Sequence, residues 1–496
     1  MNSRSFKTAA CLTLLLLSSS SALFGQLGKT WPSEKKIVPD PVTGLPLEFL
    51  TSTDGTYRQS KIYQTHRQWT SDGKWLIFRG TREAGSQAFA VNEESGLIVQ
   101  VTETGFMGML CAGNKTMKLY VLAGGGGGGR GRGEAAAPGA AEDAARGAAP
   151  AAGEAVRGAP PAAGEAAAPR AGRGPRGGGG PRQILEIDLE KLLPDAVAGT
   201  VKAPATYQRV CGTIPTGLSA DGNMGLDAND DFMYFRVSGA ETAELSPGQT
   251  LQKSMGPRNM GAGPSGLRSM NLKTGEVKMV CNVGFQIGHV QSNPWVPGEI
   301  VFCWETGGKA PQRTWFVNAD GSGLRPLYPE APYEWITHEA VISKDEVAFA
   351  MCENGRLINE PGPEPNYGNA GTWEHPTGVG IINLRTRQMR IVGQVPLWSG
   401  GRSDWHVAGS SDGRWAACDD FKYEVWLIDR HNGEVDLLAG PQKTGADHIH
   451  PTFNADNTKI EIESALISKD DRSLNICVVP LPKAFLNRAY PLKLPE

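Results

Sequence analysis

The sequence has no strong excess of positive or negative charge, and this absence bears on which kinds of molecule the protein binds. Its 49 lysines and arginines nearly balance its 52 aspartates and glutamates, and the formal net charge is −3. Proteins that bind nucleic acid or anionic membranes usually present a basic surface. We therefore expect neither nucleic acid nor an anionic membrane surface as the main partner.

Motifs of several common protein classes are missing as well. The glycine-rich segment contains no Walker loop or dinucleotide fingerprint, so its glycines do not indicate a phosphate site. We also expect no serine nucleophile elbow and no prolyl-peptidase-like hydrolase domain. Among the eight cysteines there is no Cys-x-x-Cys pair, and a thiolate metal site is therefore not expected.

Most of the cysteines resemble small core residues instead. They lie in apolar runs such as IVFCWE, FAMCEN and NICVVP, where a buried thiol behaves as a small hydrophobic side chain. One disulfide stays open as an alternative in an oxidising compartment, although an odd number leaves at least one thiol outside any intramolecular bond. The seven cysteines after Cys11 are Cys111, Cys211, Cys281, Cys303, Cys352, Cys418 and Cys477.

The apolar stretch near the start of the chain is short. Arg4 and Lys7 precede the apolar residues Ala9 to Leu16, and Ser20-Ser21-Ala22 fits a small-residue cleavage site. This pattern predicts a signal peptide over residues 1–22. The stretch is too short for a membrane-spanning helix. We expect export to the periplasm or the medium, with no integral membrane span.

Long helical periodicity is absent, and short strands take its place. Apolar and aromatic runs, separated by Gly, Asp, Asn and Pro, continue from about Leu47 to Val479, which favours an all-β fold. An Asp-Gly turn, a strand, a second strand such as EVWLIDR and a turn such as HNGEV form a repeated unit typical of a β-propeller. We predict one seven-bladed propeller domain over residues 31–490, whose units begin at His66, about Gly108, about Pro215, His289, His338, His406 and His450.

One segment departs from this pattern. Residues 124–182 are almost wholly Gly, Ala, Pro, Arg and Glu, with Val156 as the one β-branched residue. Such a composition cannot bury enough apolar surface to offset the entropy of ordering the chain. We predict a disordered surface insertion within blade two.

Five of the eight histidines occupy one position of the repeated unit. The unit reads His, five residues, Asp-Gly or a substitute, and then an apolar strand, and His289 begins a looser copy. Because a repeat protein puts equivalent positions in equivalent places, these imidazoles should face a shared location. The five are His66, His289, His338, His406 and His450.

The strongest local motif is Asp447-His448-Ile449-His450. Residues two apart in an extended strand face the same side, so both imidazoles can reach one ion. His406, one blade earlier, is the expected third ligand. Imidazole-rich sites suit Mn, Fe, Ni, Cu or Zn rather than Ca or Mg. The alternative is a pair of histidines that lines a polar channel and binds water.

If His406, His448 and His450 bind a metal ion, His338 can act as a base, since an imidazole titrates near neutral pH. Arg313, in the blade before, could bind a carboxylate with two hydrogen bonds. His66 and His289 are predicted to contact substrate, with plain repeat positions as the alternative. His375 and His431, in loop or turn contexts, receive no function.

The chain resembles the oligogalacturonate lyase family, seven-bladed propellers that cleave pectin-derived oligosaccharides by β-elimination. The resemblance runs from about Trp31 to Pro480 except in the insertion. It rests on the order and spacing of DPVTGLPLEFLT, LKTGEVKMV, IGHVQSNP, VFCWETG, RTWFVNADG, WITHEAV, HVAGSSDG and DHIHPTF.

The resemblance implies roles for particular residues. The family's proton-abstracting histidine falls on His338 and its arginine on Arg313, while its manganese ligands fall on His406, His448 and His450. It therefore implies a carbon–oxygen lyase that uses a divalent metal, Mn²⁺ in the family, and acts on uronic-acid oligosaccharides.

The chain departs from the family in two motifs. A glutamine ligand of the family is replaced by Gly445, and the family's His-Glu-Gly-Pro reads Trp304-Glu305-Thr306-Gly307 here. Another uronate oligosaccharide is therefore an open alternative as substrate.

Two other functions stay open on the sequence. One is a non-catalytic envelope propeller, related to periplasmic TolB-like domains, that binds protein or glycan at its channel face. The other is a metal-dependent oxidoreductase or isomerase that acts on sugars. The fold alone does not discriminate among them, but the histidines favour an enzyme, because a plain scaffold has no use for them.

Overall fold

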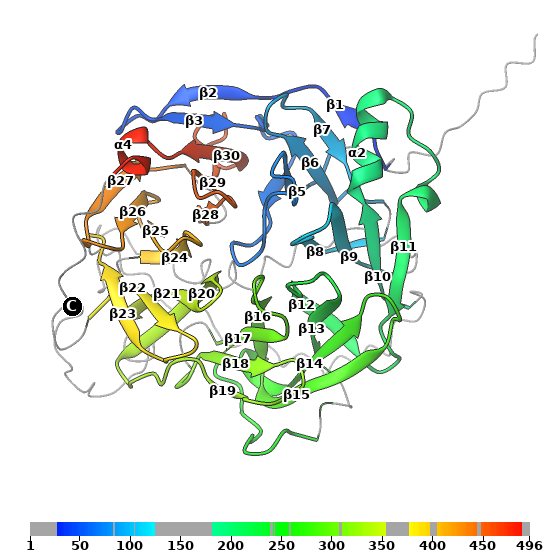
Figure 1. Ribbon diagram of the computed structural model, residues 1–496, viewed down its shortest axis with the longest axis vertical. Helices are drawn as coiled ribbons and strands as arrows, with labels where there is room; N and C mark the ends of the chain where they lie inside the picture. The colour runs from blue at the N-terminus through cyan, green and yellow to red at the C-terminus, as the bar shows by residue number, and fades with distance from the viewer. Residues whose placement is uncertain are drawn as a thin grey trace, which may run out of the picture.

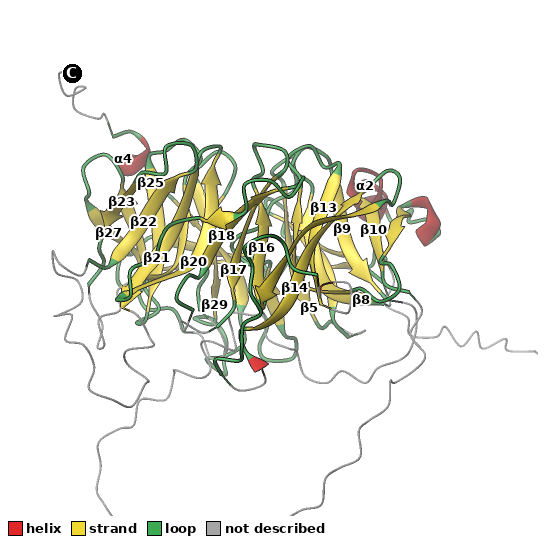
Figure 2. Cartoon of the chain, turned by 90° about the horizontal axis from the view of Figure 1, so that it is seen from below, coloured by secondary structure: helices red, strands yellow, loops and turns green. Residues whose placement is uncertain are grey.

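The strands of the computed structural model form seven antiparallel sheets around a common axis (Figure 1). The described residues are 27–82, 85–103, 105–124, 181–238, 242, 244–256, 259–306, 310–353, 376–396, 404–443 and 448–488. Seen from the side, the strands run through the thickness of a disc (Figure 2). The prediction of an all-β, seven-bladed propeller is confirmed.

We number the seven sheets as blades one to seven in chain order. Blade one consists of β4 (Gln59–Lys61), β5 (Trp75–Gly80), β6 (Gln87–Asn92) and β7 (Ile98–Gln100), with β1 (Thr30–Trp31) outside β7. Blade two consists of β8 (Phe106–Ala112), β9 (Lys118–Ala123), β10 (Gln183–Asp188) and β11 (Gln208–Thr213). Blade three consists of β12 (Ser219–Leu226), β13 (Phe232–Ser238), β14 (Ala262–Asn271) and β15 (Val277–Phe285).

Blades four to six repeat the four-stranded pattern. Blade four consists of β16 (Ile287–Ser292), β17 (Glu299–Trp304), β18 (Thr314–Asn318) and β19 (Arg325–Pro326). Blade five consists of β20 (Glu334–Ser343), β21 (Glu346–Glu353), β22 (Gly378–Asn383) and β23 (Met389–Gly393). Blade six consists of β24 (Asp404–Gly409), β25 (Trp415–Asp420), β26 (Val425–Asp429) and β27 (Val435–Ala439).

Blade seven joins the two ends of the propeller. Its inner strands are β28 (Thr452–Phe453), β29 (Lys459–Ser464) and β30 (Asn475–Pro480), and its outer strands are β3 (Pro46–Phe49) and β2 (Lys36–Pro39). The pairing of β3 with β30 is antiparallel. This pairing closes the ring, because strands from the start of the chain complete the sheet formed by its last strands.

The Asp-Gly turns of the repeat connect the inner strand of a blade to the next strand. In blade six, Ser410 Oγ donates to Asp412, and the backbone N–H of Trp415 donates to Ser410 Oγ. Gly413 takes a φ of +78° in this turn, a conformation that favours glycine. The residues 409–413 also fit the formula Gly-x-Ser-x-Gly. They join two strands, whereas a nucleophile elbow joins a strand to a helix.

The helices are few and lie outside the sheets. α2 (Leu189–Ala198) follows β10 and is capped by the side chain of Asp188 and by Gly199 at φ +67°. The other elements are the 3₁₀ turn η1 (Pro204–Thr206) and α4 (Lys483–Leu486). Within the described ranges, no helix has the length and apolar character to cross a bilayer.

The predicted insertion falls between β9 and β10, which pair with each other from Ala123 and Gln183 onward. Its position in blade two is therefore as predicted, whereas residues 125–180 lie outside the described residues. The predicted signal peptide also lies outside them. All seven described cysteines are buried and none forms a disulfide bond.

Candidate active site

The inner strands of blades four, five and six are interrupted at the same level by a β-bulge. Between Gly288 and Gln291 the strand β16 has one residue more than its partner, and so have β20 between Thr337 and Ala340 and β24 between Asp404 and Val407. A bulge bends the strand locally and turns a side chain to a new direction. The inserted stretches carry the three histidines His289, His338 and His406.

Backbone strain marks two of these positions and a third histidine, His450. His289, His338 and His450 have φ values of 47°, 50° and 54°, in the left-handed region that few non-glycine residues adopt. Such conformations cluster at functional sites, where the surrounding structure holds them in place. The repeat therefore directs its histidines to one place through bulges rather than through regular strand alternation.

The structure brings five imidazoles together in the channel. The ring centroids of His406 and His450 are 3.9 Å apart, those of His406 and His338 4.1 Å, and those of His406 and His448 5.3 Å. His289 stacks on His338 at 6.0 Å. All five rings are buried. The three predicted metal ligands and the predicted base thus share one site, which we call the histidine cluster.

Hydrogen bonds at Nδ1 set the direction of three of these rings. His406 Nδ1 lies 3.1 Å from a carboxylate oxygen of Asp419, His450 Nδ1 lies 3.0 Å from the carbonyl of His448, and His338 Nδ1 lies 3.0 Å from the carbonyl of Trp405. These oxygens only accept, so Nδ1 carries the proton in each ring. In the neutral ring Nε2 is then the nitrogen that carries a lone pair, the kind of atom that binds a metal ion or a proton.

Asp419 on β25 holds the cluster from behind and was not identified from the sequence. Its Oδ1 accepts the N–H of His406 at 2.6 Å, and its Oδ2 accepts the N–H groups of Ile449 and His450 at 3.0 and 3.2 Å in addition to His406 Nδ1. The side chain is fully buried. A carboxylate that orients a histidine in this way is the usual support of a metal ligand.

Potential ligand atoms of His406, Asp419 and His448 also lie within 4.8 Å of one another. This set contains Asp419 in place of the predicted His450. We assign Asp419 the supporting role, because its oxygens already accept four hydrogen bonds. Gly445 and Asp447, which replace or adjoin the family's glutamine ligand, lie outside the described residues.

Arg313 lies immediately before β18, and its side chain is fully buried. Its backbone N–H donates to Glu330 at 2.7 Å, which fixes the start of the strand. Burial lowers the pKa of His338 well below its ordinary value, and the nearby charges of His406, His289 and Arg313 lower it further. The positive charge of Arg313 is therefore close to the predicted base.

Blade one deviates from the bulge pattern. Lys61 pairs with Phe78, and the next pair is Trp69 with Leu76, so residues 62–67 leave the sheet as an excursion into the channel. Its Tyr63 packs against the cluster, 5.1 Å from His289 and 5.4 Å from His450 between ring centroids. Tyr63 was not predicted from the sequence, because nothing in the repeat indicates the excursion.

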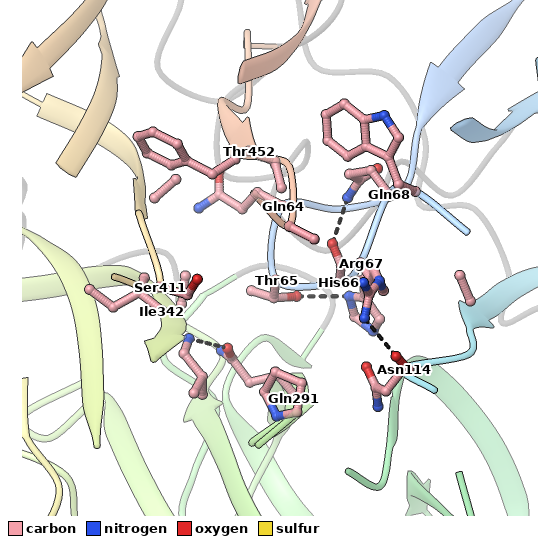
Figure 3. A pocket seen from close by; sticks show the side chains of 18 of the residues that line it. Gln64, Thr65, His66, Arg67, Gln68, Asn114, Gln291, Ile342, Ser411 and Thr452 are labelled. Atoms are coloured by element: carbon pink, nitrogen blue, oxygen red, sulfur yellow. Dashed lines mark hydrogen bonds between the residues drawn. The ribbon is translucent and has the colours of Figure 1, made fainter. Parts of the chain in front are cut away.

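His66 lies on this excursion but does not join the cluster. Its Nε2 contacts the carbonyl of Met224, and its Nδ1 lies 2.9 Å from Thr65 Oγ1, so both ring nitrogens are in hydrogen bonds. Figure 3 shows it with Gln64 and Asn114 at a cavity of about 230 Å³. This cavity is lined by residues further along the inner strands than the histidines. The substrate contact by His66 stays a prediction.

His289 belongs to the cluster but has different neighbours. Its Nε2 lies 3.7 Å from Glu305 and its Nδ1 3.6 Å from Glu339, and both carboxylates are buried. His431 lies at a surface turn after β26, and His375 lies outside the described residues.

Sequence comparison finds relatives that are named as lyases of oligogalacturonides. The oligogalacturonide lyase of Pectobacterium atrosepticum is 25% identical over 218 residues, and the oligogalacturonate lyase of Dickeya dadantii is 35% identical over 213 residues. Each match covers 40% of this chain and 52% of the relative, so the chain spans about half the length of the curated relatives it matches. No family model matches the chain.

Structure comparison covers much more of the chain. A solved oligogalacturonate lyase in complex with manganese has a TM-score of 0.62, and the oligogalacturonate lyase of Vibrio parahaemolyticus has a TM-score of 0.63. Each is 15% identical in sequence and covers 93% of this chain and 100% of the solved chain. Sequence relatives and fold therefore agree: the chain is similar to oligogalacturonate lyases in part of its sequence and in its fold.

Proposed function

We propose that this chain is a polysaccharide lyase that cleaves oligogalacturonides or related uronate oligosaccharides by metal-assisted β-elimination. The observation that carries the proposal is the histidine cluster, in which the buried rings of His338, His448 and His450 surround that of His406 at centroid distances of 3.9–5.3 Å. The sequence relatives are named as oligogalacturonate or oligogalacturonide lyases, which supports a polysaccharide lyase. They do not favour the alternative of a non-catalytic envelope propeller.

The residues of the cluster fit a divalent metal. His406 Nε2 is buried and makes no hydrogen bond within the described part of the chain, and Asp419 fixes its ring from the other side. We assign His406, His448 and His450 as ligands. Imidazole nitrogens bind Mn²⁺ among other transition metals, and the manganese complex of the solved relative supports the choice of that metal. A bound divalent metal would supply positive charge that stabilises the carboxylate of the substrate as its neighbouring proton leaves.

The remaining steps use side chains of this protein. Arg313 would bind the same carboxylate with two hydrogen bonds. His338 Nε2 would take the proton from carbon 5, and the electron pair of that bond would form the carbon 4–carbon 5 double bond. The glycosidic oxygen would then leave carbon 4 and take a proton from water. No carboxylate pair of the glycosidase kind is required for this elimination.

The neutral state of His338 supports its role as a base. Burial and neighbouring positive charge lower its pKa, so its Nε2 lone pair is available at neutral pH. A substrate carboxylate beside it would offset part of this effect and favour the protonated ring as the proton moves.

The test is the ultraviolet absorbance of the unsaturated uronate product. With manganese added, we expect the protein to produce this absorbance from oligogalacturonate or a related uronate. His338→Ala should abolish it and retain bound metal, whereas His448→Ala should lose both. His431→Ala, at the surface, is the matched control and should behave as the unaltered protein. Equal metal loss in the first two variants would contradict the assignment, and no product from any uronate would refute the lyase.

We also propose that the protein is exported, on the basis of the signal-like residues 1–22. N-terminal sequencing of the protein recovered from outside the cytoplasm should find a chain that begins near Leu23. An uncleaved, cytoplasmic chain would refute export without bearing on the lyase activity.

A further inference from the structure

A second group of potential metal ligands lies on the first two strands of blade four. His289 comes from the bulge of β16, while Cys303 lies on β17 and Glu305 follows it. Their ligand atoms all lie within 4.8 Å of one another, and the three residues are buried. The pairing of Gly288 with Cys303 brings the two strands together at this point.

The distances within this group match a coordination polyhedron. His289 Nε2 lies 3.7 Å from Glu305 Oε2, and the Cys303 thiol donates a hydrogen bond to the same oxygen, with Sγ 3.6 Å away. An N–H···O hydrogen bond is shorter, at about 2.7–3.2 Å. Zinc bonds of about 2.0–2.3 Å place neighbouring ligand atoms of a tetrahedron about 3.3–3.7 Å apart. Neither ring nitrogen of His289 makes a hydrogen bond among the described residues.

The residues around this group also leave space for the three ligands. A Cβ on Gly288 would lie 2.2 Å from Glu305 Oε2 and 3.1 Å from Cys303 Sγ, so glycine at this position leaves room for the ligands. Glu339 Oε1, fully buried, lies 3.6 Å from His289 Nδ1 on the other side of the ring. At this distance His289 Nδ1 makes no hydrogen bond, in contrast to His406 Nδ1 and Asp419, which are 3.1 Å apart.

We propose that His289, Cys303 and Glu305 bind a second divalent cation of the zinc class, distinct from the cation assigned to His406, His448 and His450. A thiolate with an imidazole and a carboxylate suits zinc better than manganese. On binding, the metal–sulfur bond forms, the S–H bond breaks, and the proton goes to solvent. The bound cation would fix the His289 ring that stacks on His338. Its assignment does not rest on the lyase activity.

The spacing of cysteines along the chain does not predict this site of His289, Cys303 and Glu305. The absence of a Cys-x-x-Cys pair argued against any thiolate metal site, but these ligands are brought together by the pairing of β16 with β17. Cys303 therefore differs from a cysteine that merely fills the core, and the difference is visible only in three dimensions.

Cobalt substitution tests the proposal, because a thiolate ligand gives Co²⁺ a charge-transfer absorption that imidazole and carboxylate ligands do not. After removal of metal with a chelator, the full chain should show this absorption on titration with Co²⁺, and Zn²⁺ should abolish it. Cys303→Ser should lack the absorption. Cys281→Ser, which removes another buried cysteine, is the matched control and should retain it.

Glu305→Gln gives a second measurement in which the thiol is kept. We expect its Co²⁺ affinity to fall by roughly 10-fold or more, as for other changes around a metal ligand. Thermal unfolding of each variant identifies those that fold. The proposal is overturned by unaltered protein that shows no thiolate absorption, by an absorption that persists in folded Cys303→Ser, or by unchanged affinity in folded Glu305→Gln.

Discussion

Asp419→Asn is the most direct test of how the histidine cluster is held. The aspartate accepts four hydrogen bonds, two from His406 and one each from the backbone N–H groups of Ile449 and His450. The amide of asparagine must turn its NH₂ group toward at least one of these donors. Hydrogen bonds to a charged acceptor contribute about 1.5–3 kcal/mol each, and a buried N–H without a partner costs about 1–3 kcal/mol.

Two effects should follow from this substitution. The free energy of unfolding should fall by roughly 2–3 kcal/mol, since at least one buried donor loses its acceptor. The affinity for Mn²⁺ should fall about 10- to 100-fold, because His406 loses the group that orients it. Equilibrium dialysis with metal analysis measures the affinity on protein shown to be folded by its thermal transition.

Asp420→Asn provides the matched control for this experiment. Asp420 is the next residue of β25 and is equally buried, but it accepts from the N–H groups of Lys422 and Glu424 and from the indole of Trp426. This variant should lose stability and keep its Mn²⁺ affinity. Unchanged affinity in folded Asp419→Asn, or an equal loss in both variants, would refute the supporting role of Asp419.

Three further predictions concern stability and rate. Burial lowers the pKa of His448 and of His450 to about 4, below the unfolded value of about 6.5. Between these pH values the unfolded chain therefore binds more protons than the folded chain. The free energy of unfolding of the metal-free protein should then fall by about 3 kcal/mol for one ring as the pH falls from about 6.5 to 4. Urea unfolding measures this free energy, and a value that does not change with pH would contradict the prediction. Lys61 pairs with Glu461 at 3.1 Å, both fully buried, so Lys61→Met should destabilise the protein by about 3–5 kcal/mol, and adding Glu461→Met should restore much of the loss. Arg313→Lys should reduce turnover roughly 10- to 100-fold with metal content unchanged, because lysine cannot form the two-pronged contact with a carboxylate; measurement of product absorbance and bound metal in one preparation checks it.

The fold was predictable because its signals are local and repeated. Each blade carries an Asp-Gly turn or a substitute and strands of alternating or continuous apolar character, and seven repeats of one unit leave few alternatives to a propeller. The convergence of His338, His406 and His450 follows from the same repeat. Equivalent positions of equivalent blades must lie at the same level of the channel.

Residues that depart from the repeat were not predictable in the same way. Asp419 lies on the second strand of its blade and reaches His406 only through the pairing of β24 with β25. Tyr63 reaches the cluster on an excursion that no other blade has, and the same excursion carries His66 away from it. A repeat argument assigned His66 to the shared location, whereas the local chain path decides where the ring lies.

The histidine cluster is also costly to the fold without an ion, and this bears on what the channel is for. Three of its histidines hold strained backbone conformations at about 1–3 kcal/mol each, and burial disfavours the charged form of every ring described in it. A purely structural propeller gains nothing from such an arrangement, since apolar side chains would fill the channel at lower cost. A cation that binds only the folded protein stabilises it and offsets part of this cost. The stabilisation grows with the logarithm of the ratio of the cation concentration to its dissociation constant. Strain and desolvation at these positions are therefore best explained by a channel whose inner strands are shaped to hold metal beside a neutral base.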